Sequence, residues 1–162
     1  MRIPKHLKFI RLKDKGRSLF ANKIIKKGEI VLRFGFDSIS SYNKASNESV
    51  QIDKDKFLDS KYYYASDFIN HGCYANTKID FESMNFVSLR DIKKGEEITY
   101  NYLTTEYDLI RDNLDFDCKC GSKKCFGRIK GFKFLTDKQK EALKPLLSPF
   151  LFKKINKKRP GR

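Results

Sequence analysis

Short stretches in which apolar and polar residues nearly alternate run through much of the first hundred residues of the chain. Alternation with a period of two is typical of a β-strand that buries one face. Helical periodicity is scarce in this part, and the polar segment 38–49 favours a loop. The pattern predicts strands within five segments: 6–13, 29–36, 49–52, 77–83 and 85–90.

The C-terminal part of the chain has a different pattern, which favours helices. Thr136 is followed three residues later by Gln139, a capping-box arrangement that marks the start of a helix. Pro145 should kink or end that helix, because proline removes a backbone donor and clashes with the preceding turn. Ser148 and Pro149 then predict the cap and first residue of a second short helix. We therefore expect a small, mainly β domain of the α+β class with a helical C-terminal appendage.

Length and composition narrow the class of protein. A chain of 162 residues is long enough for one domain with a single core. The sequence has no run of roughly eighteen apolar residues and does not begin with the apolar stretch of a secretory signal. We expect a soluble, intracellular protein.

Positive charge is concentrated toward the C-terminus. The chain has a net charge of +15, and residues 117–162 hold fifteen Lys and Arg against three acidic residues. A basic segment of this kind is typical of contact with nucleic acid or another anionic partner. A solvated tail that only improves solubility is the simpler interpretation.

The four cysteines are spaced like metal ligands. Cys118, Cys120 and Cys125 lie within DCKCGSKKC, whereas Cys73 lies far upstream in FINHGCYANT. In a reducing cell this spacing favours metal ligation over two disulfides. Zinc sites built from thiolates usually have four ligands, and the cysteine-rich segment supplies three. Taken alone, Cys73 would be interpreted as a buried apolar thiol.

Four stretches considered together have a recognisable order: KGRSLFA at 15–21, FINHGCYANT at 68–77, GEEITYNY at 95–102 and CKCGSKKC at 118–125. In this order they resemble the SET-domain family of protein-lysine methyltransferases, and the cysteine cluster resembles the family's post-SET zinc module. The resemblance spans roughly residues 7–131. It implies the SET-domain β-clip fold of short strands with a pseudoknot, followed by a post-SET zinc module and C-terminal helices.

The resemblance also implies where the fourth metal ligand lies. In the family, one structural Zn²⁺ is held by three cysteines of the post-SET module and the cysteine of the Asn-His-x-Cys segment. Cys73 would then complete the site with Cys118, Cys120 and Cys125. Such a metal joins the C-terminal segment to the catalytic core and couples zinc binding to folding.

The implied cofactor is S-adenosyl-L-methionine, the methyl donor of the family. By resemblance, Asn70 and His71 lie against it, and the segment with Lys15, Gly16 and Arg17 brings its backbone close to it. Close approach of the backbone would explain the glycine at position 16. On its own, His71 would be interpreted as an ordinary hydrogen-bonded core histidine.

Tyr100 and Tyr102 lie two residues apart in EITYNY, and therefore on one face of a predicted strand. Core packing would explain them in isolation. By resemblance, Tyr102 is the catalytic tyrosine and also contacts the cofactor, and Tyr100 sets how many methyl groups the pocket admits. The three tyrosines at 62–64 could line the lysine channel, although packing is the simpler role.

Five positions depart from the pattern of the family. Ser18 stands where a second glycine is usual, Asp67 where many members have arginine, Gly72 for serine, Ala75 for proline and Asn101 for aspartate. Asp67 is the departure with the largest expected effect, because it reverses the charge near the cofactor pocket.

The resemblance divides the chain into a SET domain at 1–116, a post-SET zinc module at 117–131 and a helical, basic C-terminal tail at 132–162. It implies methyl transfer to the ε-amine of a lysine in a protein substrate, with nucleic acid or another anionic partner at the basic tail and no membrane contact. The implied location is cytoplasmic or associated with the nucleus or nucleoid. Two alternatives remain open: a zinc-stabilised nucleic-acid-binding module and an inactive SET fold that serves as a binding protein.

Overall fold

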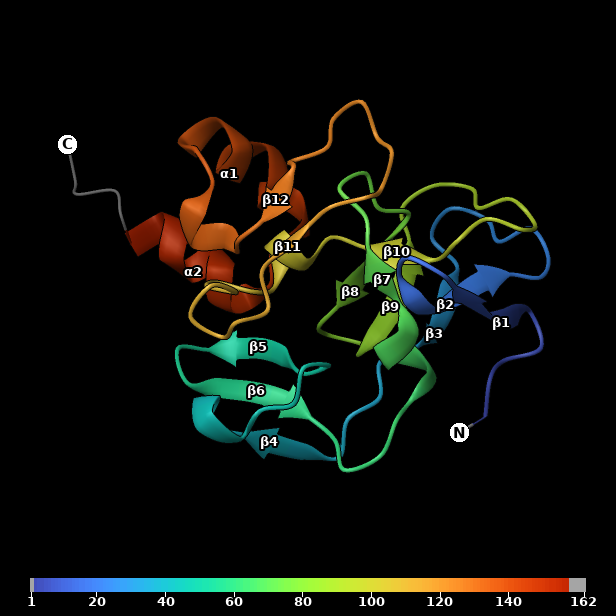
Figure 1. Cartoon of the computed structure of the whole chain (residues 1–162), viewed down its shortest axis with the longest axis horizontal. Helices are drawn as coiled ribbons and strands as arrows, with labels where there is room; N and C mark the ends of the chain where they lie inside the picture. The colour runs from blue at the N-terminus through green and yellow to red at the C-terminus, as the bar shows by residue number, and fades with distance from the viewer. Residues whose placement is uncertain (1, 158–162) are drawn as a thin grey trace.

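Short strands make up most of the regular structure in the computed structural model, which describes residues 2–157 (Figure 1). This confirms the expected mainly β class. The strands are β1 Leu7–Leu12, β2 Gly16–Ala21, β3 Ile30–Arg33, β4 Ser38–Ser40, β5 Val50–Asp53, β6 Lys56–Asp59, β7 Asn70–His71, β8 Thr77–Asp80, β9 Asn85–Ser88, β10 Thr99–Tyr100, β11 Phe116–Asp117 and β12 Arg128–Ile129. The α-helices are α1 Asp137–Leu143 and α2 Pro149–Lys157, and short 3-10 turns lie at Tyr42–Lys44, Ala65–Phe68, Tyr102–Thr104, Phe132–Phe134 and Lys144–Leu146.

The strands form several small sheets rather than one large sheet. Two of them are three-stranded and antiparallel, with the orders β3-β9-β8 and β4-β6-β5. Two antiparallel pairs, β1-β2 and β11-β12, lie toward opposite sides in Figure 1, with α1 and α2 beside β11 and β12. This arrangement places chain segments from all parts of the sequence around the centre of the molecule.

The pairing of β7 with β10 brings two of the sequence motifs together. The two strands are parallel, with Thr99 opposite Asn70 and Tyr100 opposite His71. The Gly72 N–H extends the pairing by donating a hydrogen bond of 3.0 Å to the Tyr100 carbonyl oxygen. Segments 68–77 and 95–102 therefore lie side by side, as a pseudoknot between them requires.

The segment 38–49 differs from the expected loop. Its first residues form β4, which pairs with β6 in the register Ser38 to Asp59, and a 3-10 turn follows at Tyr42–Lys44. The sequence pattern did not indicate β6 either. β4 depends on backbone pairing with the distant β6, and β6 also pairs with β5 directly before it, so the polar composition of segment 38–49 did not prevent a strand from forming.

The C-terminal helices begin where the sequence predicts. The Thr136 Oγ1 accepts from the Gln139 N–H at 3.3 Å, and the Gln139 side chain accepts from the Thr136 N–H at 2.8 Å, which completes a capping box. The Ser148 Oγ accepts from the Leu151 N–H at 3.3 Å at the start of α2. Of the expected basic tail, residues 158–162 lie outside the described part of the chain.

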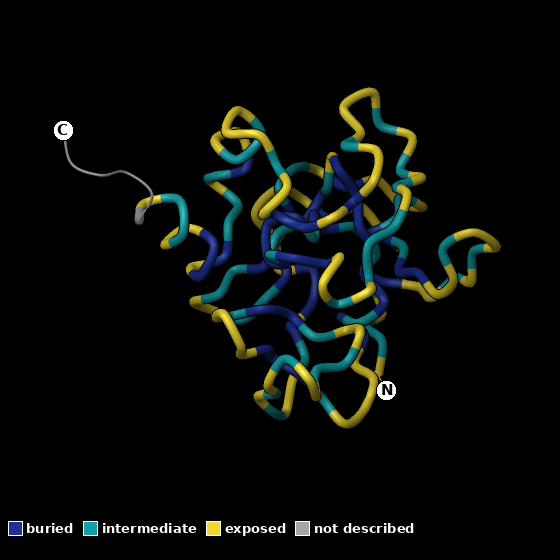
Figure 2. The backbone as a smooth tube through the Cα atoms, turned by 60° about the vertical axis from the view of Figure 1, so that its left-hand side comes forward, coloured by how far each residue is buried: buried dark blue, intermediate teal, exposed yellow. Residues whose placement is uncertain are grey.

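The buried residues form three packed groups beneath the exposed loops (Figure 2). The largest group packs β2, β3 and β9 around side chains such as Leu19, Val31 and Phe86. A second group joins Cys73 and Leu103 to the C-terminal half, and the third packs against α2. Within residues 2–157, neither helix has the length and apolar character needed to cross a membrane.

Candidate active site and metal centre

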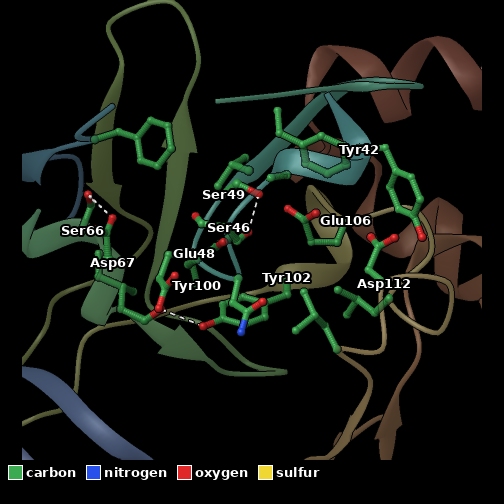
Figure 3. A pocket seen from close by; sticks show the side chains of 18 of the residues that line it. Tyr42, Ser46, Glu48, Ser49, Ser66, Asp67, Tyr100, Tyr102, Glu106 and Asp112 are labelled. Carbon is green, nitrogen blue, oxygen red and sulfur yellow. Dashed lines mark hydrogen bonds between the residues drawn. The ribbon is translucent and has the colours of Figure 1, made fainter. Parts of the chain in front are cut away.

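Tyr100 and Tyr102 line a cavity of about 440 Å³ (Figure 3). Their ring centroids are 4.8 Å apart, and the Tyr102 hydroxyl donates a hydrogen bond of 3.0 Å to the Ile69 carbonyl oxygen. The expectation that both lie on one strand is wrong, because β10 ends at Tyr100 and Tyr102 begins a 3-10 turn. The Asn101 side chain caps that turn by accepting from the Leu103 N–H at 3.0 Å. The end of β10 and the turn that follows it therefore place the two rings at the same cavity.

Both tyrosines are neutral hydrogen-bonding groups. Burial raises the pKa of the Tyr100 hydroxyl well above its usual value, and it raises the pKa of the Tyr102 hydroxyl in the same way. Neither phenol ionises near neutral pH. They can therefore orient a polar group in the cavity but cannot serve as a phenolate base.

The cavity is also lined by carboxyl groups. They belong to Glu48, Asp67, Glu106 and Asp112. Burial raises the pKa of Asp67 to about 6 and that of Glu106 to about 7. Arg111 lines the cavity too, but its guanidinium lies 2.9 Å from the Asp112 carboxylate and 3.6 Å from the centre of the Tyr42 ring. The cavity is therefore acidic in a chain whose net charge is +15.

The side-chain amide of Asn70 lies among polar atoms of three other residues. The amide nitrogen lies 2.6 Å from the Ser18 Oγ, 3.1 Å from the Glu97 Oε1 and 3.3 Å from the Arg17 carbonyl oxygen. Glu97 also forms an ion pair of 2.7 Å with Lys15. The structure thus brings together the predicted residues of the 15–21 and 68–77 motifs. It also shows what Ser18 does in place of glycine: its hydroxyl fixes Asn70.

Two glycines of the motifs have separate structural reasons. Gly16 has a φ of 72°, and a Cβ there would meet no atom of the described chain within 4 Å. The backbone conformation, rather than crowding within the protein, therefore favours glycine at this position. A Cβ at Gly72 would lie 2.8 Å from the Thr99 Oγ1, so the branched side chain of Thr99 occupies the space that a serine would need.

The three tyrosines at 62–64 are not core residues. Tyr62 and Tyr63 are 75% and 52% exposed, although the Tyr63 ring packs 5.6 Å from that of the buried Phe68. The Arg17 guanidinium lies 4.7 Å from the ring centre of Tyr63 and 4.3 Å from that of Phe68. Arg17 therefore lies against two aromatic rings that also pack against each other.

His71 connects the tyrosine site to the cysteines. The ring is buried, and its Nδ1 accepts a hydrogen bond of 3.1 Å from the Tyr102 N–H. Burial lowers the pKa of His71 to about 4, so the ring is neutral and carries its proton on Nε2. That nitrogen lies 3.2 Å from the Cys73 sulfur. Both ring nitrogens therefore have partners inside the protein.

The four cysteine sulfurs form one cluster, with every pair within 4.8 Å. Cys73 lies 3.6 Å from Cys118 and 3.8 Å from Cys125, sulfur to sulfur. Tetrahedral zinc with Zn–S bonds of about 2.3 Å separates its sulfurs by about 3.8 Å. The Phe126 N–H also donates to the Cys73 sulfur at 3.3 Å. Burial raises the pKa of the Cys73 thiol, a cost that a bound cation offsets. The residues present therefore fit a four-thiolate zinc site.

Two functional candidates were missed by sequence reasoning. Glu97, which contacts Asn70, is the second acid of the GEE segment, so the motif itself carried a signal for it. Glu106 follows Tyr102 by four residues in an unremarkable stretch. Its carboxyl group accepts from the Gln51 N–H, more than fifty residues away in the chain, a contact that no local pattern indicates.

Known proteins similar to this chain were found with a family model, with curated sequences and with solved structures. A family model described as the SET domain matches residues 16–103. A variant-silencing SET domain-containing protein of Plasmodium falciparum is 31% identical over 144 residues, which are 75% of this chain and 6% of that protein. Histone-lysine N-methyltransferase ASHH3 of Arabidopsis thaliana is 28% identical over 142 residues, which are 75% of this chain and 37% of that protein.

A solved structure has the same fold. The crystal structure of KRYPTONITE in complex with mCHG DNA and SAH matches with a TM-score of 0.61 at 22% identity, over 75% of this chain and 28% of that one. The chain thus spans only a small part of the length of the relatives that it matches. The expected β-clip fold of short strands is confirmed. The family model covers more than half of the sequence, and this chain belongs to the SET domain family.

Proposed function

We propose that this protein transfers a methyl group from S-adenosyl-L-methionine to the ε-amine of a lysine in a protein substrate. The observation that carries the proposal is the pair of neutral tyrosines at the cavity, with the Tyr102 hydroxyl fixed on the Ile69 carbonyl oxygen. Relatives named histone-lysine N-methyltransferases from plants and animals support the reaction class.

The cofactor, when bound, supplies an electrophilic methyl group on a sulfonium. Methyl transfer to an amine is an in-line displacement, so the protein contributes mainly position and exclusion of water. Tyr102 is the proposed catalytic residue, because its hydroxyl and the Ile69 carbonyl oxygen form a fixed polar edge where an amine can be aligned. Tyr100 is the proposed determinant of how many methyl groups the cavity admits, because its ring packs 4.8 Å from that of Tyr102.

The cofactor site is proposed to lie around Asn70, on the side of β7 that faces β2. Lys15, Gly16, Arg17, His71 and Tyr102 complete the proposed set. In support, the Asn70 amide is oriented by Ser18 and Glu97. Glu97 and the backbone of the 15–17 segment offer polar groups for the cofactor's charged amino acid end.

We further propose one structural Zn²⁺ held by Cys73, Cys118, Cys120 and Cys125, in keeping with the geometry of the sulfur cluster. The proposed organisation is a SET domain at 1–116, a post-SET zinc module at 117–131 and a helical basic segment at 132–162. The second hydrophobic group supports direct packing of the proposed SET domain against the proposed zinc module. In this group Cys73 and Leu103 pack with Ile129.

Histones or other basic proteins are the proposed substrates, and nucleic acid is the proposed partner of the basic segment from Lys153 onward. The names of the relatives and the DNA complex of the matched structure support these choices. The proposed location is accordingly intracellular, at the nucleus or nucleoid or in the cytoplasm.

The test is transfer of labelled methyl groups from S-adenosyl-L-methionine to core histones and to a cell lysate. We expect labelled protein with the unmodified chain and a loss of about 100-fold or more with Tyr102→Phe, because that hydroxyl acts on the geometry of the transition state. Tyr62→Phe is the matched control, since Tyr62 is 75% exposed and should retain full activity.

Cofactor binding is measured in parallel, because it distinguishes an inactive binding protein from an enzyme in which Tyr102 has no role. Tyr102→Phe should bind S-adenosylhomocysteine nearly as well as the unmodified chain. Binding of this ligand without any transfer would favour an inactive binding protein. An unimpaired rate in Tyr102→Phe would remove Tyr102 from the mechanism.

A further inference from the structure

Glu106 is a buried carboxyl group that the chemistry described so far does not use. The residue is 7% exposed and lines the same cavity as Tyr100 and Tyr102. Figure 3 shows its carboxyl group pointing into this cavity. Removing a carboxyl group from water costs free energy unless the group is neutral or is paired with a cation. A carboxyl group at this position, beside the proposed catalytic tyrosine, is therefore a candidate to bind a cation or to exchange a proton.

The backbone fixes Glu106 relative to Tyr102. The Glu106 N–H donates a hydrogen bond of 2.8 Å to the Tyr102 carbonyl oxygen, and the Glu106 carbonyl oxygen accepts one of 2.8 Å from the Phe132 N–H. On the side chain, Oε1 accepts from the Gln51 N–H at 3.3 Å, and the Thr105 hydroxyl also interacts with the carboxyl group. The carboxyl group is thus held at the cavity wall by both neighbouring segments.

The surroundings of Glu106 contribute mainly negative or neutral groups. Arg111 lies in the cavity wall, but Asp112 binds its guanidinium at 2.9 Å. Lys154 of α2, a helix that packs against β5, lies 4.2 Å from the centre of the Tyr107 ring. The titratable and charged residues that share the cavity wall with Glu106 are Tyr42, Glu48, Asp67, Tyr100, Tyr102, Arg111 and Asp112. An incoming cation would therefore meet an acidic wall.

We propose that Glu106 binds the ε-ammonium group of the substrate lysine in this cavity and accepts the proton that the lysine must lose before methyl transfer. The inference rests on the proposed function. An N–H bond of the ammonium breaks, the proton moves to a carboxylate oxygen of Glu106, and the electron pair remains on the nitrogen. That nitrogen attacks the methyl carbon while the carbon–sulfur bond breaks and its electrons stay on sulfur. Glu106 then releases its proton to water before the next turnover.

The cavity makes this proton transfer more favourable than it would be in water. In water, a lysine pKa of about 10.4 and a glutamate pKa of about 4.3 strongly favour the ion pair. In the empty cavity, burial raises the pKa of Glu106 to about 7, and burial lowers the pKa of a lysine that enters, so desolvation opposes the attraction between the two charges. Transfer also replaces a buried ion pair by two neutral groups, which removes much of the desolvation penalty.

The first test needs no methyl transfer and uses n-butylamine, which carries the same terminal ammonium as a lysine side chain. The carboxyl carbon of Glu106 is followed by NMR during a pH titration of carbon-13-labelled full chain, with its signal assigned from the Glu106→Gln spectrum. We expect millimolar n-butylamine to lower the apparent pKa of Glu106, because a bound ammonium favours the carboxylate. A titration curve that n-butylamine does not move would overturn cation binding by Glu106.

The second test is the pH dependence of transfer to the acceptor found in the histone and lysate assay. Near neutral pH, Glu106→Gln should reduce kcat/KM by about 100-fold, the scale of general base catalysis. The deficit should shrink as the pH rises from about 7 toward the lysine pKa of about 10.4, because more of the lysine is then already neutral. Glu141→Gln is the matched control, since this glutamate is exposed on α1 and pairs with Lys144.

The outcomes distinguish this inference from the proposed function. A deficit of the same size at every pH would indicate a structural role for Glu106, and an unimpaired Glu106→Gln protein would refute the inference while leaving methyl transfer intact. If the unmodified chain transfers no methyl groups, the proposed function fails. The n-butylamine titration still decides in that case whether Glu106 binds an ammonium group.

Discussion

Replacing Glu106 by Gln should make the folded protein more stable at neutral and alkaline pH. The carboxyl group is buried, and burial raises its pKa from an ordinary value of 4.5 to about 7. The folded protein therefore binds a proton more tightly at this position than the unfolded chain does. The resulting stabilisation is fully present below about pH 4.5 and is lost as the pH rises through about 7. A glutamine is neutral at every pH and has no such loss.

The magnitude follows from the difference between the two pKa values. One pKa unit corresponds to about 1.36 kcal/mol, so ionised Glu106 lowers the free energy of unfolding by about 3 kcal/mol once the pH exceeds about 7. At about pH 5 the folded carboxyl group is still protonated, and the loss is about 1 kcal/mol. The advantage of Glu106→Gln over the unmodified chain should therefore grow by about 2 kcal/mol between about pH 5 and about pH 8. The amide oxygen of glutamine can still accept from the Gln51 N–H, which keeps the local contact similar.

Urea unfolding of both proteins at a series of pH values measures this difference. Effects of the substitution that do not depend on pH cancel when only the slope of the difference is considered, as do all other titrating groups that behave alike in the two proteins. Glu141→Gln, at an exposed position, should show a constant difference near zero. Parallel stability curves for Glu106→Gln and the unmodified chain would refute the reasoning. A gain in stability together with the expected loss of transfer would place Glu106 among residues kept for function at the expense of stability.

Three further predictions concern the metal, the product and the basic segment. Cys73→Ser should reduce the zinc content below one per chain and destabilise the protein by several kcal/mol, measured by elemental analysis and thermal unfolding; full zinc content would contradict the proposed ligand set. Tyr100→Phe should shift mono- and dimethyl-lysine toward higher methylation in mass spectra, because it removes a hydroxyl that can hold a water in the cavity; dominant trimethyl-lysine from the unmodified chain at early turnover would argue against this. Removing the chain from Lys153 onward should weaken DNA binding and reduce its dependence on salt concentration. DNA binding with the same affinity and the same salt dependence after truncation would exclude a role for that segment.

Local sequence signals predicted the local structure well. The capping box at Thr136 and the cap at Ser148 depend on neighbouring residues only, and both are present. The alternating segments around β1, β8 and β9 are strands as well, and β1 with β2 and β8 with β9 are pairs of strands adjacent in the chain. By contrast, β4 forms in a polar segment because Ser38 pairs with Asp59 across the chain. No pattern within either segment could reveal that partner.

The candidate site also has some features that the sequence predicts and others that only the fold reveals. The motifs indicated Asn70 and Tyr102, because their residue types occur in a fixed order along the chain. The end of β10 at Tyr100 was not predictable from alternation, since the turn that follows is set by the Asn101 cap. The acidic character of the cavity was not predictable either, because Asp67 and Glu106 come from distant segments that only the fold brings together.

The cysteine cluster proposed to bind zinc and the tyrosine site are joined by one short chain of hydrogen bonds, so we expect zinc to affect methyl transfer as well as stability. The Tyr102 N–H can only donate, and it donates to the His71 Nδ1 at 3.1 Å. The Nε2 proton of the neutral ring then faces the Cys73 sulfur at 3.2 Å. A thiolate at Cys73, as a zinc ligand, would accept a hydrogen bond from this N–H and would favour the tautomer in which Nδ1 accepts from Tyr102. In Cys73→Ser, transfer should therefore fall at temperatures where circular dichroism still reports a folded chain. Activity that declines only in step with unfolding would mean that the zinc acts on stability alone.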